Sequence, residues 1–194
     1  MTRSRRAAPL PQALWTFGHS TRTADQTVEL LRHNDIVRVV DVRSFPGSRR
    51  CPWFGAEAMG GWLAEAGIEY RRIAELGGRR GRQPVDPEVN AGWSNESFHR
   101  YADWTLSEDF DRGLADLAQC TQRRTAIMCS EAVPWRCHRS LIASVLTARG
   151  WHVTHIVDAD SVLPHRLGQW GAEPEVRPDG TVTYPRPGTA PLFD

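Results

Sequence analysis

The sequence predicts a three-layer α/β fold, in which helices cover both faces of a doubly wound, mostly parallel sheet of about five strands. Short apolar runs rich in β-branched residues alternate with longer segments whose apolar residues recur at helical spacing. A polar cluster follows almost every apolar run, as expected where parallel strands end at a binding edge. Hydrophobic residues make up 40% of the 194 residues and charged residues 24%, which fits one globular domain with tails.

The first half of the domain supplies three strands and two helices. The first helix begins after Thr23, which has the spacing of a capping box with Gln26, and the second helix ends at Gly67. β-Branched residues dominate the second strand. In chain order we expect a strand at 14–17, a helix ending near Asn34, a strand at 36–40, a helix at 56–66 and a strand at 68–76.

The second half begins with a long loop, residues 77–97, whose Gly, Arg, Pro and Asn content is typical of a functional lid or a disordered segment. Pro134 suits the first turn of a helix and Gly150 suits its end, so we expect a helix between them. The remaining predicted elements are helices at 98–104 and 108–120 and strands at 125–129 and 152–157.

The α/β domain is expected to span residues 13–158, between a disordered basic tail at 1–12 and a C-terminal extension at 159–194. Pro178-Asp179-Gly180 predicts a small hairpin in the extension, followed by a loose tail. We expect Leu192 and Phe193 in this tail either to fold back onto the domain or to dock on a partner. The pair is a weak match to the motif with which bacterial replication proteins bind the sliding clamp.

The composition indicates a cytoplasmic protein. With no signal peptide, four cysteines point to a reducing cytosol and not to a disulfide scaffold. No apolar run approaches membrane-spanning length, so no membrane partner is expected. All 24 basic residues are arginine, yet the formal net charge is only +1, which excludes a strongly basic surface overall.

The densest group of reactive side chains lies in one stretch of eleven residues before and within the predicted helix at 134–150. We expect Arg136, His138 and Arg139 in the first helical turn, where they extend into solvent or help the helix N-terminus hold an anion. The stretch supplies four candidate catalytic residues, Cys129, Glu131, Cys137 and His138, and two candidate substrate-binding residues, Arg136 and Arg139.

Further polar residues follow the other predicted strands. The carboxyl ends of parallel strands meet at one edge of a sheet, so we expect a single cleft there. Asp41 joins the catalytic candidates, because a carboxylate can orient a ring nitrogen of histidine. The other substrate-binding candidates are His19, Ser20, Arg43 and Glu75, and Asp158 follows the last strand.

Four sequence blocks together resemble the family called domain of unknown function 488. They are Gly18-His19-Ser20, the block from Asp41 to Pro46, Glu75-Leu76-Gly77-Gly78, and the block from Cys129 to Arg139. The resemblance extends over residues 13–158. It implies a cytosolic bacterial or archaeal protein with two cysteines of suspected function, and it brings no established reaction.

The candidate residues favour a thiol-dependent hydrolase or transferase. A cysteine close to a helix N-terminus, Arg and His is readily deprotonated and nucleophilic, and His138 or Glu131 then serves as the base. Arginine binds carboxylates and phosphates bidentately, so the expected substrate is anionic, such as a nucleotide or a modified base. The structural alternative is that Cys129 and Cys137 are inert packing residues and that Asp41 and Arg43 form an ion pair.

Two other functions stay open. Eight arginines between residues 43 and 82, with aromatic residues among them, fit a nucleic-acid-binding accessory protein without catalysis. Cys129, Cys137 and His138, with His19 as a further candidate, are ligand types that zinc prefers. Adjacent residues on a helix diverge by about 100°, which argues against one metal ion shared by Cys137 and His138. We therefore expect neither a metal nor another cofactor.

Overall fold

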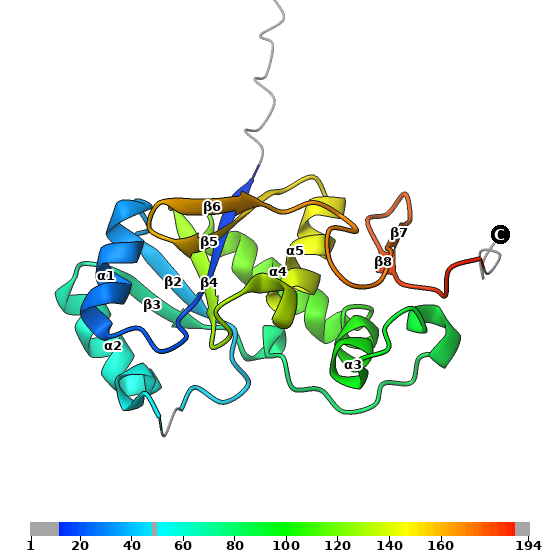
Figure 1. The fold of residues 1–194 in the computed structure, drawn as a ribbon, viewed down its shortest axis with the longest axis horizontal. Helices are drawn as coiled ribbons and strands as arrows, with labels where there is room; N and C mark the ends of the chain where they lie inside the picture. The colour runs from blue at the N-terminus through cyan, green and yellow to red at the C-terminus, as the bar shows by residue number, and fades with distance from the viewer. Residues whose placement is uncertain (1–11, 48–49, 189–194) are drawn as a thin grey trace, which may run out of the picture.

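The structure is a computed structural model that describes residues 12–47 and 50–188. Within these ranges six strands form one sheet, in the order β3-β2-β4-β1-β5-β6 (Figure 1). All neighbouring strands are parallel except β5 and β6. The strands are β1 (Ala13–Gly18), β2 (Arg38–Asp41), β3 (Glu69–Arg72), β4 (Thr125–Cys129), β5 (His152–Asp158) and β6 (Ser161–Pro164). The predicted basic tail, apart from Gln12, and the Leu192–Phe193 pair lie outside the described residues.

Helices cover both faces of the sheet, which confirms the predicted α/β fold (Figure 1). One face packs on α1 and α2, and the other on α4 and α5. Successive residues of β2 show this division, because Val39 belongs to the first apolar cluster and Val40 to the second. The helices are α1 (Ala24–His33), α2 (Ala56–Glu65), α3 (Glu96–Trp104), α4 (Glu108–Cys120) and α5 (Arg139–Ala148).

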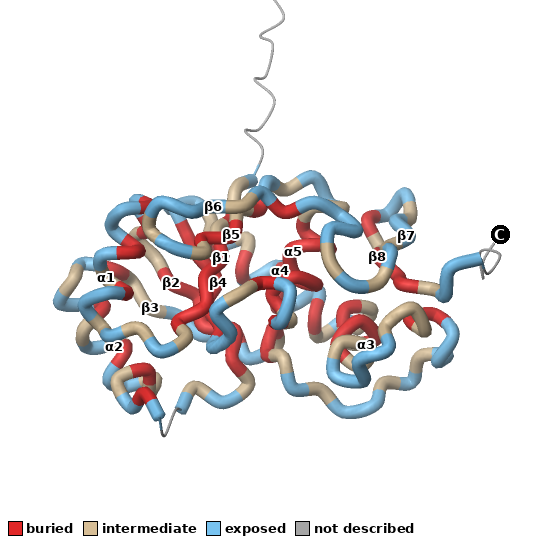
Figure 2. Tube along the Cα trace, in the orientation of Figure 1, coloured by how far each residue is buried: buried red, intermediate tan, exposed pale blue. Residues whose placement is uncertain are grey.

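Burial is deepest in the centre of the molecule. Every residue of β4 is buried, and so are the first eight residues of α5 (Figure 2). A strand covered on both faces loses the alternation of polar and apolar residues, which explains the continuous apolar run of Ala126, Ile127 and Met128. The reactive stretch that joins β4 to α5 is therefore attached at both ends to fully buried segments of the fold.

The chain changes direction at the carboxyl ends of β1 and β4. From β1 it crosses to β2 on one side, whereas from β4 it crosses through α5 to β5 on the other side. Main-chain hydrogen bonds join the two ends, since His19 N donates to Cys129 O at 2.9 Å. Val42 N donates to Met128 O at 3.0 Å, which joins the end of β2 to the end of β4 in the same way. Ligands of doubly wound sheets bind at such a switch point.

Local sequence explains several helix ends. Thr23 and Gln26 form the predicted capping box, with both of its hydrogen bonds present. Asn95 and Ser107 accept main-chain hydrogen bonds at the starts of α3 and α4. Gly67 follows α2 with a φ of 76°, a conformation that glycine adopts without steric cost.

Two strands differ from the prediction. β3 ends at Arg72 and does not continue to Leu76, because its partner β2 ends at Asp41 and the chain turns into a 3₁₀ helix, Ala74–Leu76. β6 was not predicted at all, because it forms only by folding back against β5. Its exposed residues and its terminal Pro164 are typical of an edge strand.

The helix expected from Pro134 begins only at Arg139. Pro134–Arg136 form a separate 3₁₀ turn, and Cys137 is extended, with φ −135° and ψ 140°. The prediction that Arg136, His138 and Arg139 share one helical turn was therefore wrong. An extended residue between two helical segments redirects the side chains on either side of it, and the reactive cluster described below depends on this break.

The C-terminal extension packs on the domain. β7 (Glu175–Val176) pairs antiparallel with β8 (Val182–Thr183), which confirms the predicted hairpin. Tyr184 is buried in the apolar cluster that contains α4 and α5. Asn90, in the long loop at 77–97, donates to Asp103 at 2.8 Å and accepts from Tyr184 N at 3.0 Å, so this loop is anchored. Across the described ranges no helix is both long and apolar enough to cross a membrane.

Candidate active site

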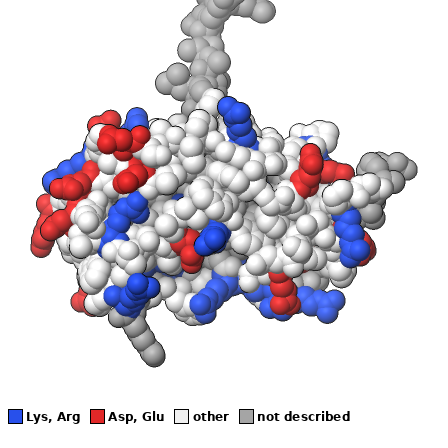
Figure 3. Space-filling view, in the orientation of Figure 1, with Lys and Arg blue, Asp and Glu red and all other residues white. Residues whose placement is uncertain are grey.

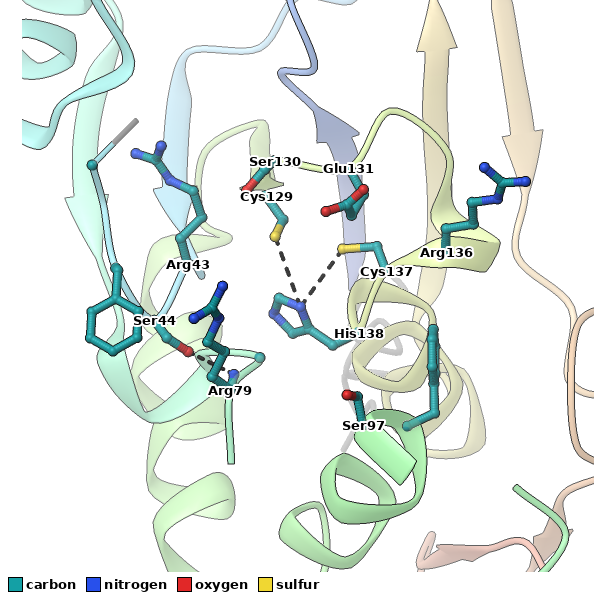
Figure 4. A pocket seen from close by; sticks show the side chains of 14 residues that line it. Arg43, Ser44, Arg79, Ser97, Cys129, Ser130, Glu131, Arg136, Cys137 and His138 are labelled. Atoms are coloured by element: carbon teal, nitrogen blue, oxygen red, sulfur yellow. Dashed lines mark hydrogen bonds between the residues drawn. The ribbon is translucent and has the colours of Figure 1, made fainter. Parts of the chain in front are cut away.

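A cleft with a volume of about 940 Å³ opens at the switch point (Figure 4). Its lining comes from segments far apart in the sequence: the loops that follow β2 and the 3₁₀ helix Ala74–Leu76, the start of α3, and the stretch between β4 and α5. Six predicted site residues line the cleft: Arg43, Cys129, Glu131, Arg136, Cys137 and His138.

Two thiols and one imidazole meet at the base of this cleft. The Sγ atoms of Cys129 and Cys137 lie 3.9 Å and 3.7 Å from Nδ1 of His138. Both sulfurs point toward the ring in Figure 4. Cys129 is 8% exposed and Cys137 is 2% exposed, so the pair is shielded from bulk water but open to the cleft.

The hydrogen-bond network assigns the tautomer of His138. Its Nε2 lies 3.0 Å from the main-chain oxygen of Val42, which can only accept a hydrogen bond, so Nε2 carries the hydrogen. Nδ1 then presents its lone pair to the two thiols. The carbonyl that orients the ring belongs to the chain just after β2, whereas Asp41 had been predicted for this role.

Arg139 is fully buried beside the cluster. Its Nε donates to Cys137 Sγ at 3.3 Å, and its terminal nitrogens donate to Thr16 Oγ1 at 3.0 Å and Glu131 O at 2.6 Å. Among the described residues no carboxylate pairs with this guanidinium. A buried charge requires a counter-charge, and the nearest group that can supply one is the Cys137 thiolate.

The two thiols have opposite tendencies to ionise. Burial raises the pKa of Cys137, but the hydrogen bond from Cys129 and the charge of Arg139 outweigh it and hold that pKa well below its usual value. The hydrogen bond with Cys137, reinforced by burial, raises the pKa of Cys129. Cys137 is therefore the thiol of this pair that ionises more readily, and Cys129 is the one that holds its proton more strongly.

Asp41 and Arg43 form a buried ion pair below the cleft wall. Arg43 donates to both carboxylate oxygens, at distances from 2.7 to 3.1 Å, and Tyr70 donates its hydroxyl to Oδ2 at 2.9 Å. These bonds occupy the Asp41 carboxylate, so the structure places it in a supporting position outside the cleft lining. Burial and the neighbouring Asp41 raise the pKa of Tyr70, which keeps that donor protonated.

His19 lies behind Arg43 and not in the cleft. Its ring stacks on Phe54 at 4.0 Å, and Nδ1 lies 2.9 Å from the Ser20 carbonyl, so Nδ1 is the donor. Nε2 is 3.4 Å from an Arg43 nitrogen and accepts from it. Desolvation lowers the pKa of His19 to about 4, so the ring is neutral and positions the Arg43 guanidinium.

Three further predicted residues lie outside the cleft. Ser20 and Asp158 line a separate cavity beside α1. Glu75 is partly buried, with its Cβ near the position that a Cβ on Gly113 of α4 would occupy. The predicted convergence of polar strand ends therefore holds for Cys129, Glu131 and Arg43, and the other strand ends serve neighbouring surfaces.

The three reactive side chains also satisfy the first requirement of a metal site. Ligand atoms of Cys129, Cys137 and His138 all lie within 4.8 Å of one another. Cys137 and His138 would diverge only on a continuous helix, and the prediction of such a helix was wrong, because Cys137 is extended and α5 begins after His138. His19, the other candidate ligand, does not belong to the group.

Two glycines make room for the cluster. A Cβ on Gly18 would lie 1.6 Å from the Glu131 carbonyl oxygen, which is the oxygen that Arg139 holds. A Cβ on Gly78 would lie 2.3 Å from Nδ1 of His138. Both positions therefore require glycine because another part of the site approaches the backbone closely.

The mouth of the cleft carries charge and aromatic surface. In the described part of the chain neither the Arg136 nor the Glu131 side chain has an ion pair, and Arg79 stacks on the ring of Phe45 at 5.7 Å. Phe45 is 69% exposed. Trp135 is 42% exposed but lines a neighbouring cavity, where its ring packs against Trp170 at 5.4 Å. Figure 3 shows basic and acidic groups interspersed over the face in view, in keeping with the small net charge.

A comparison with protein families finds one match. The family described as domain of unknown function DUF488 matches residues 23–146, more than half of the chain. The chain belongs to the DUF488 family. Comparisons with curated proteins and with solved structures find no match. The DUF488 region ends within α5, so it includes the whole reactive stretch but not β5, β6 or the hairpin.

Sequence reasoning missed several residues of the DUF488 cleft. Ser44 and Phe45 lie inside a block that carried the resemblance, and Arg79 directly follows another, so a signal for them was present. Ser97 and Phe98 enter from the start of α3, and nothing in the local sequence marks them as part of the site. Tertiary contacts of α3 bring them to the cleft: Tyr101 donates to the Leu76 carbonyl at 2.9 Å, and its ring contacts that of His138 at 4.8 Å.

Proposed function

We propose that this DUF488 protein is a cysteine-dependent enzyme that acts on an anionic substrate, with Cys137 as the nucleophile. The observation that carries the proposal is the buried Arg139, which donates to Cys137 Sγ at 3.3 Å and has no carboxylate partner among the described residues. A thiolate is the nucleophilic form of cysteine, and here it is maintained by a fixed positive charge.

The neighbouring groups have matching roles. The Cys137 sulfur forms a bond to an electrophilic atom of the substrate, the bond to the leaving group breaks, and the Cys129 thiol supplies the proton that the leaving group takes up. Water, or the hydroxyl or amine of an acceptor substrate, then attacks the Cys137 adduct, and the bond to Cys137 sulfur breaks to release the thiolate. His138 Nδ1 takes the proton of this second nucleophile and passes it to the Cys129 sulfur. Arg136 and Arg79 at the mouth bind the anionic part of the substrate.

Two alkylating reagents test this proposal, because iodoacetate is anionic and iodoacetamide is a neutral reagent of similar size. In metal-free protein we expect Cys137 to react at pH 7. We expect the ratio of the iodoacetate rate to the iodoacetamide rate to exceed that of a free cysteine by roughly 10-fold, equivalent to about 1.4 kcal/mol from one charge-assisted hydrogen bond. Mass spectrometry of the modified peptides identifies the reactive cysteine.

Matched variants separate the cleft from the rest of the surface. Arg136→Gln and Arg79→Gln should reduce the preference for iodoacetate, whereas Arg112→Gln, on an exposed part of α4, should leave it unchanged. An unreactive Cys137, or equal ratios for protein and free cysteine, would contradict the proposal.

A second candidate function is binding of a single-stranded nucleic acid, and the exposed aromatic side chains in and next to the cleft favour it. Phe45 lines the cleft with Arg79 over its ring, and the partly exposed Trp135 lines the neighbouring cavity together with Arg136. Exposed rings stack on bases, and unpaired arginines contact phosphates. If the protein has this function, the anionic ligand that the cleft binds is a polynucleotide.

Salt dependence tests this second function. The affinity for a short single strand should fall with salt, with a log–log slope of about −0.7 per phosphate contacted. Arg79→Gln should reduce the magnitude of that slope by about 0.7, the contribution of one phosphate contact. Phe45→Ala should cost about 1–3 kcal/mol of binding free energy without changing the slope. Absence of binding at low salt would eliminate the nucleic-acid function.

A further inference from the structure

We infer that Cys129, Cys137 and His138 form a binding site for a zinc ion, with a fourth coordination position open to the cleft. The inference concerns the same three side chains as the proposed function, but it does not depend on either thiol being a nucleophile. It names a chemical class of ligand for the cluster, a borderline-soft divalent cation.

The distances agree with tetrahedral coordination. Zinc lies about 2.3 Å from a thiolate sulfur and about 2.0–2.1 Å from an imidazole nitrogen, so a tetrahedral angle separates sulfur and nitrogen by about 3.5–3.6 Å. The Cys137 and Cys129 sulfurs lie 3.7 Å and 3.9 Å from His138 Nδ1. Shifts of a few tenths of an ångström would complete the geometry for these two ligand pairs.

The surroundings orient the ligands as in established metal sites. His138 Nε2 donates to the Val42 carbonyl at 3.0 Å, which directs the Nδ1 lone pair toward the sulfurs. Arg139 donates to Cys137 Sγ at 3.3 Å and offsets part of the negative charge of two thiolates. Such outer hydrogen bonds hold a ligand in place before a metal binds, which lowers the cost of ordering the site.

The ligand set discriminates between metals and leaves one position free. Two thiolates and an imidazole select zinc or similar metals over Mg²⁺ and Ca²⁺, which prefer oxygen. In the described part of the chain this group has three members, whereas structural zinc sites have four protein ligands. The missing position faces the cleft that Arg136 and Glu131 also line, so water or an anionic oxygen would fill it.

The inference predicts a competition at the cluster. A thiolate bound to zinc is a ligand, so zinc should protect Cys129 and Cys137 from alkylation. The reactive position of the loaded protein would then be the fourth coordination site and no longer the Cys137 sulfur. The cleft would therefore contain a nucleophilic thiolate when zinc is absent and an open coordination position on the metal when zinc is bound.

The test begins with the wild-type protein, freed of metal by a chelator and titrated with CoCl₂ and then ZnCl₂. We expect one Co²⁺ per chain, with thiolate-to-cobalt charge-transfer absorption and the visible bands of tetrahedral cobalt, and displacement by Zn²⁺. Zinc should also slow iodoacetamide labelling of Cys129 and Cys137 by more than roughly 10-fold, because the ligand sulfurs are no longer free. Stoichiometric binding without thiolate charge transfer, or no binding, would overturn the inference.

Variants locate the metal. Cys129→Ser, Cys137→Ser and His138→Gln should each weaken Co²⁺ binding by more than about 100-fold. Gly78→Ala displaces the imidazole while keeping all three ligands, and Gly81→Ala is its control, because a Cβ there meets nothing within 4 Å. Cys120→Ala controls for a buried cysteine elsewhere. Equal Co²⁺ affinity of Gly78→Ala and Gly81→Ala would contradict the assignment of His138.

The outcomes for the zinc site and the proposed function are distinguishable. Rapid labelling of Cys137 with no metal binding would retain the proposed function and overturn the zinc site. Metal binding with an unreactive Cys137 in the metal-free protein would retain the zinc site and remove the thiolate nucleophile. Labelling that is fast without zinc and suppressed with zinc would support both.

Discussion

Arg139→Gln should lower the free energy of unfolding by about 3–5 kcal/mol, the range observed when one partner of a buried ionic pair is removed. Arg139 is fully buried and donates to Cys137 Sγ, Thr16 Oγ1 and the Glu131 carbonyl. The shorter amide cannot reach all three, so buried acceptors lose their partners. Urea unfolding at pH 7 measures the change.

The control lies directly after the same helix. Arg149, which follows the last residue of α5, pairs with Asp111 at 2.8 Å, but both side chains are partly exposed. Arg149→Gln should therefore cost no more than about 1 kcal/mol. If Arg139→Gln lowered the free energy of unfolding as little as this control does, the three buried acceptors would not depend on the Arg139 guanidinium.

A double-mutant cycle tests the counter-charge argument. If the Cys137 thiolate balances Arg139, the single changes Arg139→Gln and Cys137→Ser should be non-additive by more than about 1 kcal/mol. Additive effects would mean that the sulfur is a neutral thiol that happens to lie near the guanidinium. Arg139→Gln should also slow alkylation of Cys137 at pH 7.

Acidification from pH 7 to pH 5 should destabilise the protein by up to about 2 kcal/mol for each of three buried histidines. Desolvation lowers the pKa of His19 to about 4, of His155 to about 3 and of His165 to about 4. In the unfolded chain a histidine titrates near 6.5, so between pH 6.5 and about 4 the unfolded state binds more protons. Stability is therefore complete above pH 6.5 and is lost as the pH falls through this window.

A directional hydrogen-bond chain explains why His155 and His165 must stay neutral. Arg139 donates to Thr16 Oγ1, Thr16 donates to His155 Nδ1 at 2.8 Å, and His155 Nε2 donates to His165 Nδ1 at 2.9 Å. His165 Nε2 then donates to Ser144 Oγ at 3.1 Å. Protonation of His165 at Nδ1 would place two N–H donors face to face, and protonation of His155 at Nδ1 would remove the acceptor of the Thr16 hydroxyl, so either change breaks this chain.

Urea midpoints at pH 7, 6, 5 and 4.5 measure this loss. His155→Gln should remove about one third of the pH dependence, because one of three titrating groups is gone. His152→Gln, an exposed residue at the start of β5, should retain all of it. Equal stability at pH 7 and pH 5 would show that the buried rings do not titrate as described.

Local sequence was enough to predict β1 to β5, the helices between them and the edge of the sheet where the site lies. Periodic apolar residues specify a helix or a strand locally, and caps such as Thr23 act over three residues, so neither needs a distant partner. Parallel strands must end at a common edge, so the sequence alone predicts that Arg43 and Cys129 share one cleft, as they do.

The tertiary structure alone decided the chemistry of the site. The sequence predicted Arg139 on the first turn of a helix that starts at Pro134, either in solvent or binding an anion, and instead it is fully buried next to Cys137. Val42, 96 positions before His138, sets the tautomer of that ring. Burial, counter-charge and ring orientation each depend on groups distant in the chain, and local pattern carries no information about such pairings.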